Sequence, residues 1–225
     1  TGVTRGDRIA LALPDPLSTI IALQGGLKAG ATVVPLNSRL LQAERDSIFA
    51  DLAPALVIDE LPDGEANFES LEVADDGSAI ILYTSGTTGA PKGVLLSHGG
   101  TEFALESWKT SVMGLVPGDV VLSALPLAHS LGIFGSVMAP LMAGASVVLV
   151  PRFTPEDCIK AIGRHHITVF PGVATMFRRI LDAPEIGSAD FSSLRYALSG
   201  AAPCPWELAQ AWKAATGVRI IRGYG

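Results

Sequence analysis

The residues best suited to chemistry lie in one stretch, YTSGTTGAPKG, at positions 83–93. It combines hydroxyl groups, glycines and one ammonium group, on Thr84, Ser85, Thr87, Thr88, Gly86, Gly89, Gly93 and Lys92. Glycine lets the backbone bring successive N–H groups close to a ligand, and hydroxyls and lysine donate hydrogen bonds to phosphate oxygens. The stretch therefore predicts a phosphate site. A flexible turn that binds nothing is the alternative interpretation.

The phosphate stretch lies between two short apolar runs, at 79–82 and 93–96, and each of these runs predicts a strand. The stretch is thus expected at the tip of a hairpin. A Walker A loop needs G-x-x-x-x-G-K-[ST] between a strand and a helix, which is a different arrangement.

The string YTSGTTGAPKG resembles the phosphate-binding signature of the adenylate-forming superfamily, which includes acyl-CoA synthetases, aryl-CoA ligases, luciferases and the adenylation domains of peptide synthetases. The run LKAGATVVPLN, at 27–37, resembles a second signature upstream. The resemblance implies that the stretch holds the β- and γ-phosphates of ATP and that Lys92 acts in catalysis. The residues implied in nucleotide binding are Thr84, Ser85, Gly86, Thr87, Thr88, Gly89 and Lys92.

Strand and helix patterns alternate along the chain. Strands are expected at 8–13, 32–35, 55–58, 79–82, 93–96, 120–125, 147–150, 167–170, 195–198 and 218–222. Helices are expected at 16–28, 42–50, 100–113, 131–142, 155–164, 173–181 and 205–215. This order predicts an α/β fold, with repeated strand–helix units forming mostly parallel sheets flanked by helices, as in the large N-terminal domain of the superfamily.

An acid-rich connector at 59–77, which contains no Lys or Arg, suggests a division of the chain. We expect residues 1–78 to form part of a first α/β subdomain with this connector, and residues 79–225 to form the phosphate loop and a second subdomain. The carboxylates of the connector lack regular ligand spacing, so no metal site is assigned to them. The resemblance implies that the superfamily's small C-terminal domain is absent.

Small residues follow several expected parallel strands, at the edge where open α/β sheets bind ligands. Of these, SGAAP at 199–203 resembles the superfamily's adenine-contacting segment, and Tyr224 resembles the tyrosine that stacks on adenine. The nucleotide contacts implied at these strand ends are Ser199, Gly200, Ala201, Ala202, Gly223, Tyr224 and Gly225. An ordinary strand-to-helix turn is the alternative for each glycine.

The segment LPLAHSLG, at 125–132, resembles the part of the superfamily that borders the acyl pocket, which implies a catalytic and substrate-binding role for His129. A histidine satisfied at a strand end is the alternative. Val173 and Met176, after the Pro-Gly turn at 171–172, are candidates for the pocket wall. His98, at the start of an expected helix, is given a structural role.

Composition limits the class of protein. The 225 residues carry a net charge of −6 and are 48% hydrophobic, which predicts a large core and excludes a basic stripe for nucleic acid. The charge-free run at 120–150 is long enough to span a membrane, but prolines and glycines break it into strand, helix and strand. Cys158 and Cys204 match no disulfide or metal pattern, and with no visible signal peptide a cytoplasmic protein is expected.

The resemblance implies a ligase that uses ATP, Mg²⁺ and CoA and turns an apolar acid, a fatty acid in the first instance, into an acyl adenylate and then a thioester. An aryl-acid CoA ligase and a nucleotide-binding fragment without turnover are the alternatives. A serine hydrolase is set aside because G-x-S-x-G does not occur. The resemblance places Thr-Glu after GYG, a ribose-binding Asp and a catalytic Lys outside the chain, so these residues alone are expected to be inactive.

Overall fold

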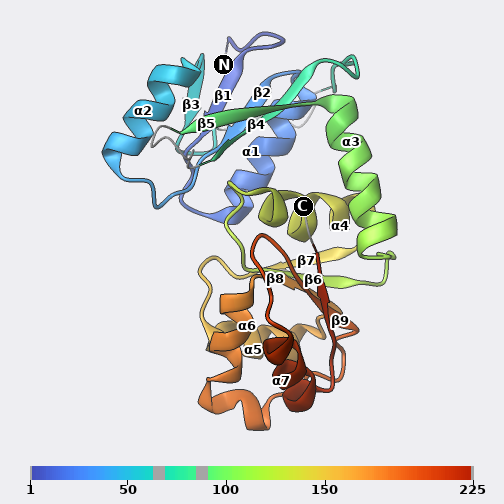
Figure 1. Cartoon of the computed structure of the whole chain (residues 1–225). Coiled ribbons are helices and arrows are strands. Elements are labelled where there is room, and N and C mark those ends of the chain that lie inside the picture. The colour runs from blue at the N-terminus through green and yellow to red at the C-terminus, as the bar shows by residue number, and fades with distance from the viewer. Residues whose placement is uncertain (1, 63–68, 85–90, 224–225) are drawn as a thin grey trace. The chain divides into compact units, whose positions relative to one another are not determined.

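A computed structural model describes residues 2–62, 69–84 and 91–223 of the chain. The chain divides into two compact units, each built on its own sheet (Figure 1). The first unit comprises Thr1–Ala104 and Leu127–His129, and the second comprises Leu105–Pro126 and Ser130–Gly225. The predicted α/β fold of mostly parallel sheets with flanking helices is confirmed.

The first unit contains a five-stranded sheet in the order β3-β1-β2-β4-β5, in which β5 alone runs antiparallel to its neighbour. All four residues of β2 are buried, as expected for a strand in the middle of a parallel sheet. The strands are β1 (Arg8–Leu11), β2 (Thr32–Pro35), β3 (Leu56–Ile58), β4 (Ser78–Thr84) and β5 (Lys92–Ser97). The helices that begin in this unit are α1 (Pro16–Lys28), α2 (Gln42–Leu52) and α3 (His98–Ser107).

Helix α1 shows how local sequence sets these elements. Asp15 caps its first turn, because the Asp15 carboxylate accepts a hydrogen bond of 2.8 Å from the Ser18 N–H. Gly30 ends it with a positive φ of 68°. Between them, a Cβ on Gly26 would lie 2.7 Å from a methyl carbon of Val33 on β2, so the glycine allows the helix to pack closely on the sheet.

The second unit contains an all-parallel sheet in the order β10-β9-β8-β6-β7. Its strands are β6 (Val120–Ser123), β7 (Ser146–Leu149), β8 (Val169–Gly172), β9 (Tyr196–Ser199) and β10 (Ile220–Arg222). Its helices are α4 (Ala139–Met142), α5 (Pro155–His165), α6 (Ala174–Leu181) and α7 (Trp206–Thr216), with a 3₁₀ turn at Pro184–Ser188. Helix α5 starts where the sequence predicts, since the Thr154 hydroxyl accepts from the Asp157 N–H at 3.0 Å.

Helices α5, α6 and α7 bury their apolar faces in one core with β6, β8 and β9. Phe177 lies at its centre, with edge-to-face contacts to Phe170 at 5.3 Å and to Trp212 at 5.0 Å between ring centroids. The side chains of all three aromatic residues are fully buried. This core fixes the strands whose ends form the candidate site.

Two expected helices differ from the prediction in their hydrogen bonding. The sequence predicts α-helices at 100–113 and 131–142. In the structure, wider π-helical turns occupy Trp108–Val112 and Leu131–Met138 within these segments. Pro140, just after the second of these, cannot donate a main-chain hydrogen bond. Gly132 lies so close to the Pro126 carbonyl that a Cβ there would clash with its oxygen. Periodicity alone does not distinguish a π-helical turn from an α-helical one.

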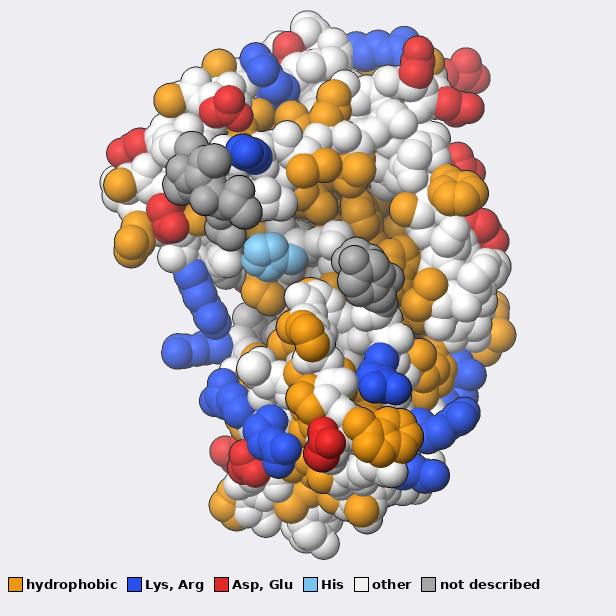
Figure 2. Space-filling view, in the orientation of Figure 1, with side chains coloured by type: hydrophobic (Ala, Val, Ile, Leu, Met, Phe, Trp, Pro, Cys, Tyr) orange, Lys and Arg blue, Asp and Glu red, His pale blue; other side chains and the backbone are white. Residues whose placement is uncertain are grey.

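The charge-free run at 120–150 forms β6, the π-helical and α4 segment, and β7, as predicted. Among the described residues, no helix is long and apolar enough to cross a membrane. On the visible face in Figure 2, Lys and Arg side chains are interspersed with Asp and Glu side chains.

The division of the structure differs from the expected boundary between residues 78 and 79. Strands β4 and β5 belong to the first sheet, through the pairing of β4 with β2, and the first unit extends to Ala104. The acid-rich connector is therefore a link within the first unit. Its composition indicates exposure to solvent but not which sheet the next strand joins.

Candidate functional site

The carboxyl ends of three neighbouring strands lie side by side in the second unit. The register of the sheet pairs Gly172 with Ser199 and Ser199 with Arg222. Main-chain hydrogen bonds continue past the strands, from the Gly200 N–H to the Gly172 carbonyl at 3.2 Å and from the Gly223 N–H to the Ser199 carbonyl at 2.8 Å. The alignment of small residues expected from the sequence is thus present at the edge where parallel sheets bind ligands.

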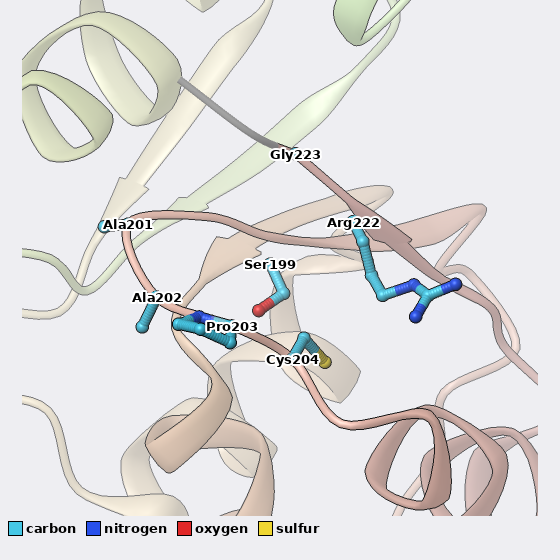
Figure 3. A pocket seen from close by; sticks show the side chains of 7 residues that line it. All are labelled: Ser199, Ala201, Ala202, Pro203, Cys204, Arg222 and Gly223. Atoms are coloured by element: carbon cyan, nitrogen blue, oxygen red, sulfur yellow. The ribbon is translucent and has the colours of Figure 1, made fainter.

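A pocket of about 590 Å³ opens at this edge (Figure 3). Small side chains form much of its wall, so a flat ligand can approach the backbone closely. The residues that line it are Ser199, Ala201, Ala202, Pro203, Cys204, Arg222 and Gly223.

Ser199 gives the pocket a buried polar group. Its side chain is 1% exposed, and its hydroxyl has no hydrogen-bond partner among the described residues. A buried hydroxyl without a partner costs free energy, and a ligand that supplies a donor or acceptor would remove that cost. Ala201, two residues on, has a positive φ of 61°, a conformation that is uncommon for residues other than glycine.

The described part of the phosphate stretch lies in the first unit, on the β4–β5 hairpin that the sequence predicts. Thr84 and Lys92 are paired across the two strands at the end of the hairpin, and the Thr84 hydroxyl donates to the Lys92 carbonyl at 3.4 Å. Both residues are exposed, which leaves the Lys92 ammonium accessible to an anion. The residues Ser85, Gly86, Thr87, Thr88 and Gly89 lie outside the described part of the chain, as do Tyr224 and Gly225.

Tyr83 holds the loop end of this hairpin. The Tyr83 hydroxyl donates to the Asp51 carboxylate on α2 at 2.6 Å. Burial, together with that hydrogen bond and the negative charge of Asp51, raises the pKa of Tyr83 well above its ordinary value, so the phenol remains a donor. A Cβ on Gly93 would lie 3.2 Å from the Tyr83 ring, so this glycine allows the ring to cover the strand.

The other predicted site residues are placed as follows. His129 is exposed in the loop after β6. Val173 follows Gly172 and precedes α6, partly buried against the second unit's core. Met176 is 6% exposed and packs within that core, so the pocket at Ser199 does not include it. Gly200 is buried between the lining residues, and a Cβ there would lie 3.3 Å from Leu131.

His98 has the surroundings of a structural residue. Its main-chain N–H donates to the Gly77 carbonyl at 2.9 Å, which ties the start of α3 to the connector. Burial, and then the positive charge of Arg5, lower the pKa of His98 and favour the neutral ring.

Sequence reasoning missed two residues of the pocket, Cys204 and Arg222. Arg222 directly precedes the GYG string and Cys204 follows SGAAP, so proximity to these motifs was an available signal. Arg222 also lies over the exposed Trp206 ring, with its guanidinium carbon 5.4 Å from the ring centroid.

A second missed cluster lies at the opposite edge of the same sheet. Asp119, 2% exposed, accepts hydrogen bonds from the Thr168 hydroxyl at 2.6 Å and from Arg195 at 2.7 and 3.1 Å. Burial opposes the ionisation of Asp119, yet the hydrogen bonds from Thr168, the Val116 N–H and Arg195 outweigh it and lower the pKa of Asp119. These residues precede or begin β6, β8 and β9, so the cluster ties the amino ends of three strands.

Among the described residues, no group of three His, Cys, Asp or Glu side chains is arranged to hold a metal ion.

The sequence matches the family described as AMP-binding enzyme, over residues 1–79 and 60–225. A feruloyl-CoA synthase from an Amycolatopsis species is 32% identical over 246 residues, covering 100% of this chain and 50% of that protein. A long-chain-fatty-acid–CoA ligase of Bacillus subtilis is 28% identical, covering 100% of this chain and 51% of that protein. The crystal structure of ATP-bound MatB from Rhodopseudomonas palustris superimposes with a TM-score of 0.89 at 28% identity, covering 100% of this chain and 50% of that one. The chain thus spans about half the length of these relatives.

Proposed function

Because this chain belongs to the AMP-binding enzyme family, we propose that it carries the nucleotide site of an ATP-dependent acid–thiol ligase. The observation that supports this most is the pocket at the carboxyl ends of β9 and β10. The buried Ser199 hydroxyl in that pocket has no hydrogen-bond partner among the described residues. In the proposed role, the adenine of ATP occupies this pocket. The relatives named feruloyl-CoA synthase and long-chain-fatty-acid–CoA ligase support the reaction class.

The proposed reaction has two steps. A carboxylate oxygen attacks the α-phosphorus of ATP, the bond to the leaving pyrophosphate breaks, and an acyl adenylate forms. The sulfur of CoA then attacks the acyl carbon, and AMP leaves. The protein contributes positioning and charge stabilisation, which act on the phosphates as negative charge shifts.

We assign the following roles to the residues of this chain. Lys92 and Thr84, with Ser85, Gly86, Thr87, Thr88 and Gly89, hold the β- and γ-phosphates and then the pyrophosphate. The segment Ser199, Gly200, Ala201 and Ala202, with Gly223, Tyr224 and Gly225, holds the adenine. His129 and Val173 contact the acid in this proposal. Met176 is buried in the core, so it supports Val173 in the wall of the acid pocket without contacting the acid itself.

Mg²⁺ belongs to this proposal as a partner of the phosphates. Mg²⁺ keeps several waters and uses one or two carboxylates together with phosphate oxygens. The described residues offer no carboxylate cluster for it, so no residue of this chain is assigned to the metal and no step depends on it here.

The proposed substrate is an apolar acid without an amino group, fatty in the first instance. Residues 125–134, which contain His129, include no Asp or Glu. An ammonium group buried without a carboxylate partner would be costly, which disfavours amino acids. The feruloyl-CoA synthase relative favours an aryl acid as the second candidate.

The adenine pocket can be tested by filling it. Ala202 is exposed in the pocket wall, and Ala214 is also an exposed alanine, on α7 outside that wall. We expect Ala202→Trp to weaken ATP binding by about tenfold or more, which corresponds to about 1.4 kcal/mol, measured by equilibrium dialysis. Ala214→Trp is the matched control and should bind like the unchanged chain. Equal binding by the two variants would place the nucleotide elsewhere.

A further inference from the structure

The two cysteines of the chain have opposite surroundings. Cys158 is fully buried in the second unit's core, and burial, followed by the charge of Asp157, raises the pKa of its thiol to about 12. The thiolate is the reactive form of cysteine, so Cys158 is inert in the folded protein. Cys204 is partly exposed and lines the pocket at the ends of β9 and β10.

The Cys204 side chain is available within that pocket. Among the described residues, its thiol makes one hydrogen bond, to the Pro205 carbonyl oxygen at the long distance of 3.9 Å. Figure 3 shows the Cys204 sulfur and the Ser199 hydroxyl among the side chains that line this pocket. That hydroxyl, 1% exposed and unpartnered among the described residues, is independent evidence that a ligand belongs in this space.

Arg222 adds a positive charge to the same wall. Its guanidinium carbon lies 5.4 Å from the centroid of the Trp206 ring, and Figure 3 shows the Arg222 side chain starting from the β10 side of the pocket. A fixed cation raises the local concentration of anionic reagents relative to neutral ones.

We propose that Cys204 is a modification site at which a small anionic disulfide closes the nucleotide pocket. The Cys204 thiolate attacks one sulfur of the disulfide, a mixed disulfide forms, and the other half leaves as a thiol that takes up a proton. The disulfide is the oxidant, and a reducing thiol reverses the step. The closing of the pocket to ATP rests on the proposed function, whereas the selective modification of Cys204 does not.

The test uses the whole chain, reduced and then treated with glutathione disulfide without denaturant. We expect the intact mass to rise by one glutathionyl group, and peptide mapping to find it on Cys204 with Cys158 unmodified. The modified chain should bind ATP at least about tenfold more weakly and recover on treatment with dithiothreitol. ATP at ten times its Kd should slow the modification by about tenfold, since only the free pocket reacts.

Two variants separate the parts of the inference. Cys204→Ser should acquire no glutathionyl group, and its own Kd for ATP should be the same before and after treatment. Arg222→Gln should react more slowly with glutathione disulfide than the unchanged chain, yet at the same rate with the neutral disulfide of 2-mercaptoethanol.

Modification of Cys158, or a Cys204 adduct that binds ATP as tightly as the untreated chain, would overturn the inference and leave the proposed function standing. Failure of the untreated chain to bind ATP at all would instead overturn the proposed function, together with the claim that the adduct blocks it.

Discussion

Replacing Asp119 tests whether the cluster at the amino edge of the second sheet holds its strands in place. In Asp119→Ala, the Val116 N–H loses its acceptor at 2.9 Å and the Thr168 hydroxyl loses its acceptor at 2.6 Å. Hydrogen bonds to a charged group contribute roughly 1.5 to 3 kcal/mol each. The Thr168 hydroxyl can turn to the Val120 carbonyl at 3.3 Å, so the lower end applies and the two bonds amount to about 3 kcal/mol.

The ion pair with Arg195 adds little to this figure. The Arg195 side chain is 45% exposed, so water solvates the guanidinium once its partner is removed. We therefore expect the free energy of unfolding of the second unit to fall by about 3 kcal/mol, well above the effect of most surface changes.

The assay is urea denaturation followed by tryptophan fluorescence. All three tryptophans, Trp108, Trp206 and Trp212, lie in the second unit, so the signal reports that unit alone. Asp182→Asn, at an exposed position, is the control and should change stability by less than about 0.5 kcal/mol. A loss in Asp119→Ala no larger than in this control would refute the reasoning.

The stabilisation by the Asp119 carboxylate should also depend on pH, in a direction set by its lowered pKa. The pKa of Asp119 is lowered in the folded protein, so its stabilisation is fully present above the ordinary carboxyl pKa and is lost as pH falls through the folded value. The difference in stability between the unchanged chain and Asp119→Asn should therefore be largest near neutral pH and shrink in acid. A difference that stays constant down to the acid limit would show that the carboxylate charge plays no part.

Three further predictions concern the proposed reaction. Lys92→Ala should raise the Kd for ATP by about tenfold to a hundredfold, since a charged hydrogen bond contributes roughly 1.5 to 3 kcal/mol, while the exposed Lys213→Ala should not. Fatty or aryl acids, and not free amino acids, should support pyrophosphate exchange in a protein that contains this chain together with the rest of the family pattern. These 225 residues by themselves should form no CoA thioester from ATP, Mg²⁺, CoA and an acid, because they span about half the length of the relatives. Each preorganised contact to the transition state that the other half of a relative supplies would be missing, and the loss of one typically raises the barrier by about 2.7 to 4 kcal/mol.

Each of these predictions has a clear contrary result. Equal Kd values for the Lys92 and Lys213 variants would remove Lys92 from the phosphate site. Exchange with amino acids alone would contradict the substrate class. Thioester formation at a rate close to that of a full-length relative would show that the catalytic groups lie within these 225 residues.

Local signals in the sequence predict much of the fold. The caps at Asp15 and Thr154 mark where α1 and α5 begin, and the apolar runs on either side of the phosphate stretch become the β4–β5 hairpin. The small residues after β8, β9 and β10 also come together as expected. These features depend on neighbours within a few residues or on the general rule that parallel strands end at one edge.

The features that sequence could not predict depend on distant residues. Asp119 bonds to residues 49 and 76 positions away, so no window along the chain contains the cluster. The burial of Met176 also depends on how α6 meets the core. The membership of Cys204 in the pocket likewise depends on the path of the loop after β9.

The carboxyl and amino edges of the second sheet carry different kinds of side chain, small at the first and charged at the second. At the carboxyl edge, Gly172, Ser199 and Gly223 leave room for a ligand to reach the backbone, but such small side chains make few contacts that could hold the strands. At the amino edge, Asp119 accepts hydrogen bonds from Thr168 and Arg195, and the three residues directly precede three strands. The same paired strands run from the amino edge to the carboxyl edge, so a cluster that fixes their amino ends also limits the movement of their carboxyl ends. Weakening Asp119 should therefore loosen the pocket without touching it.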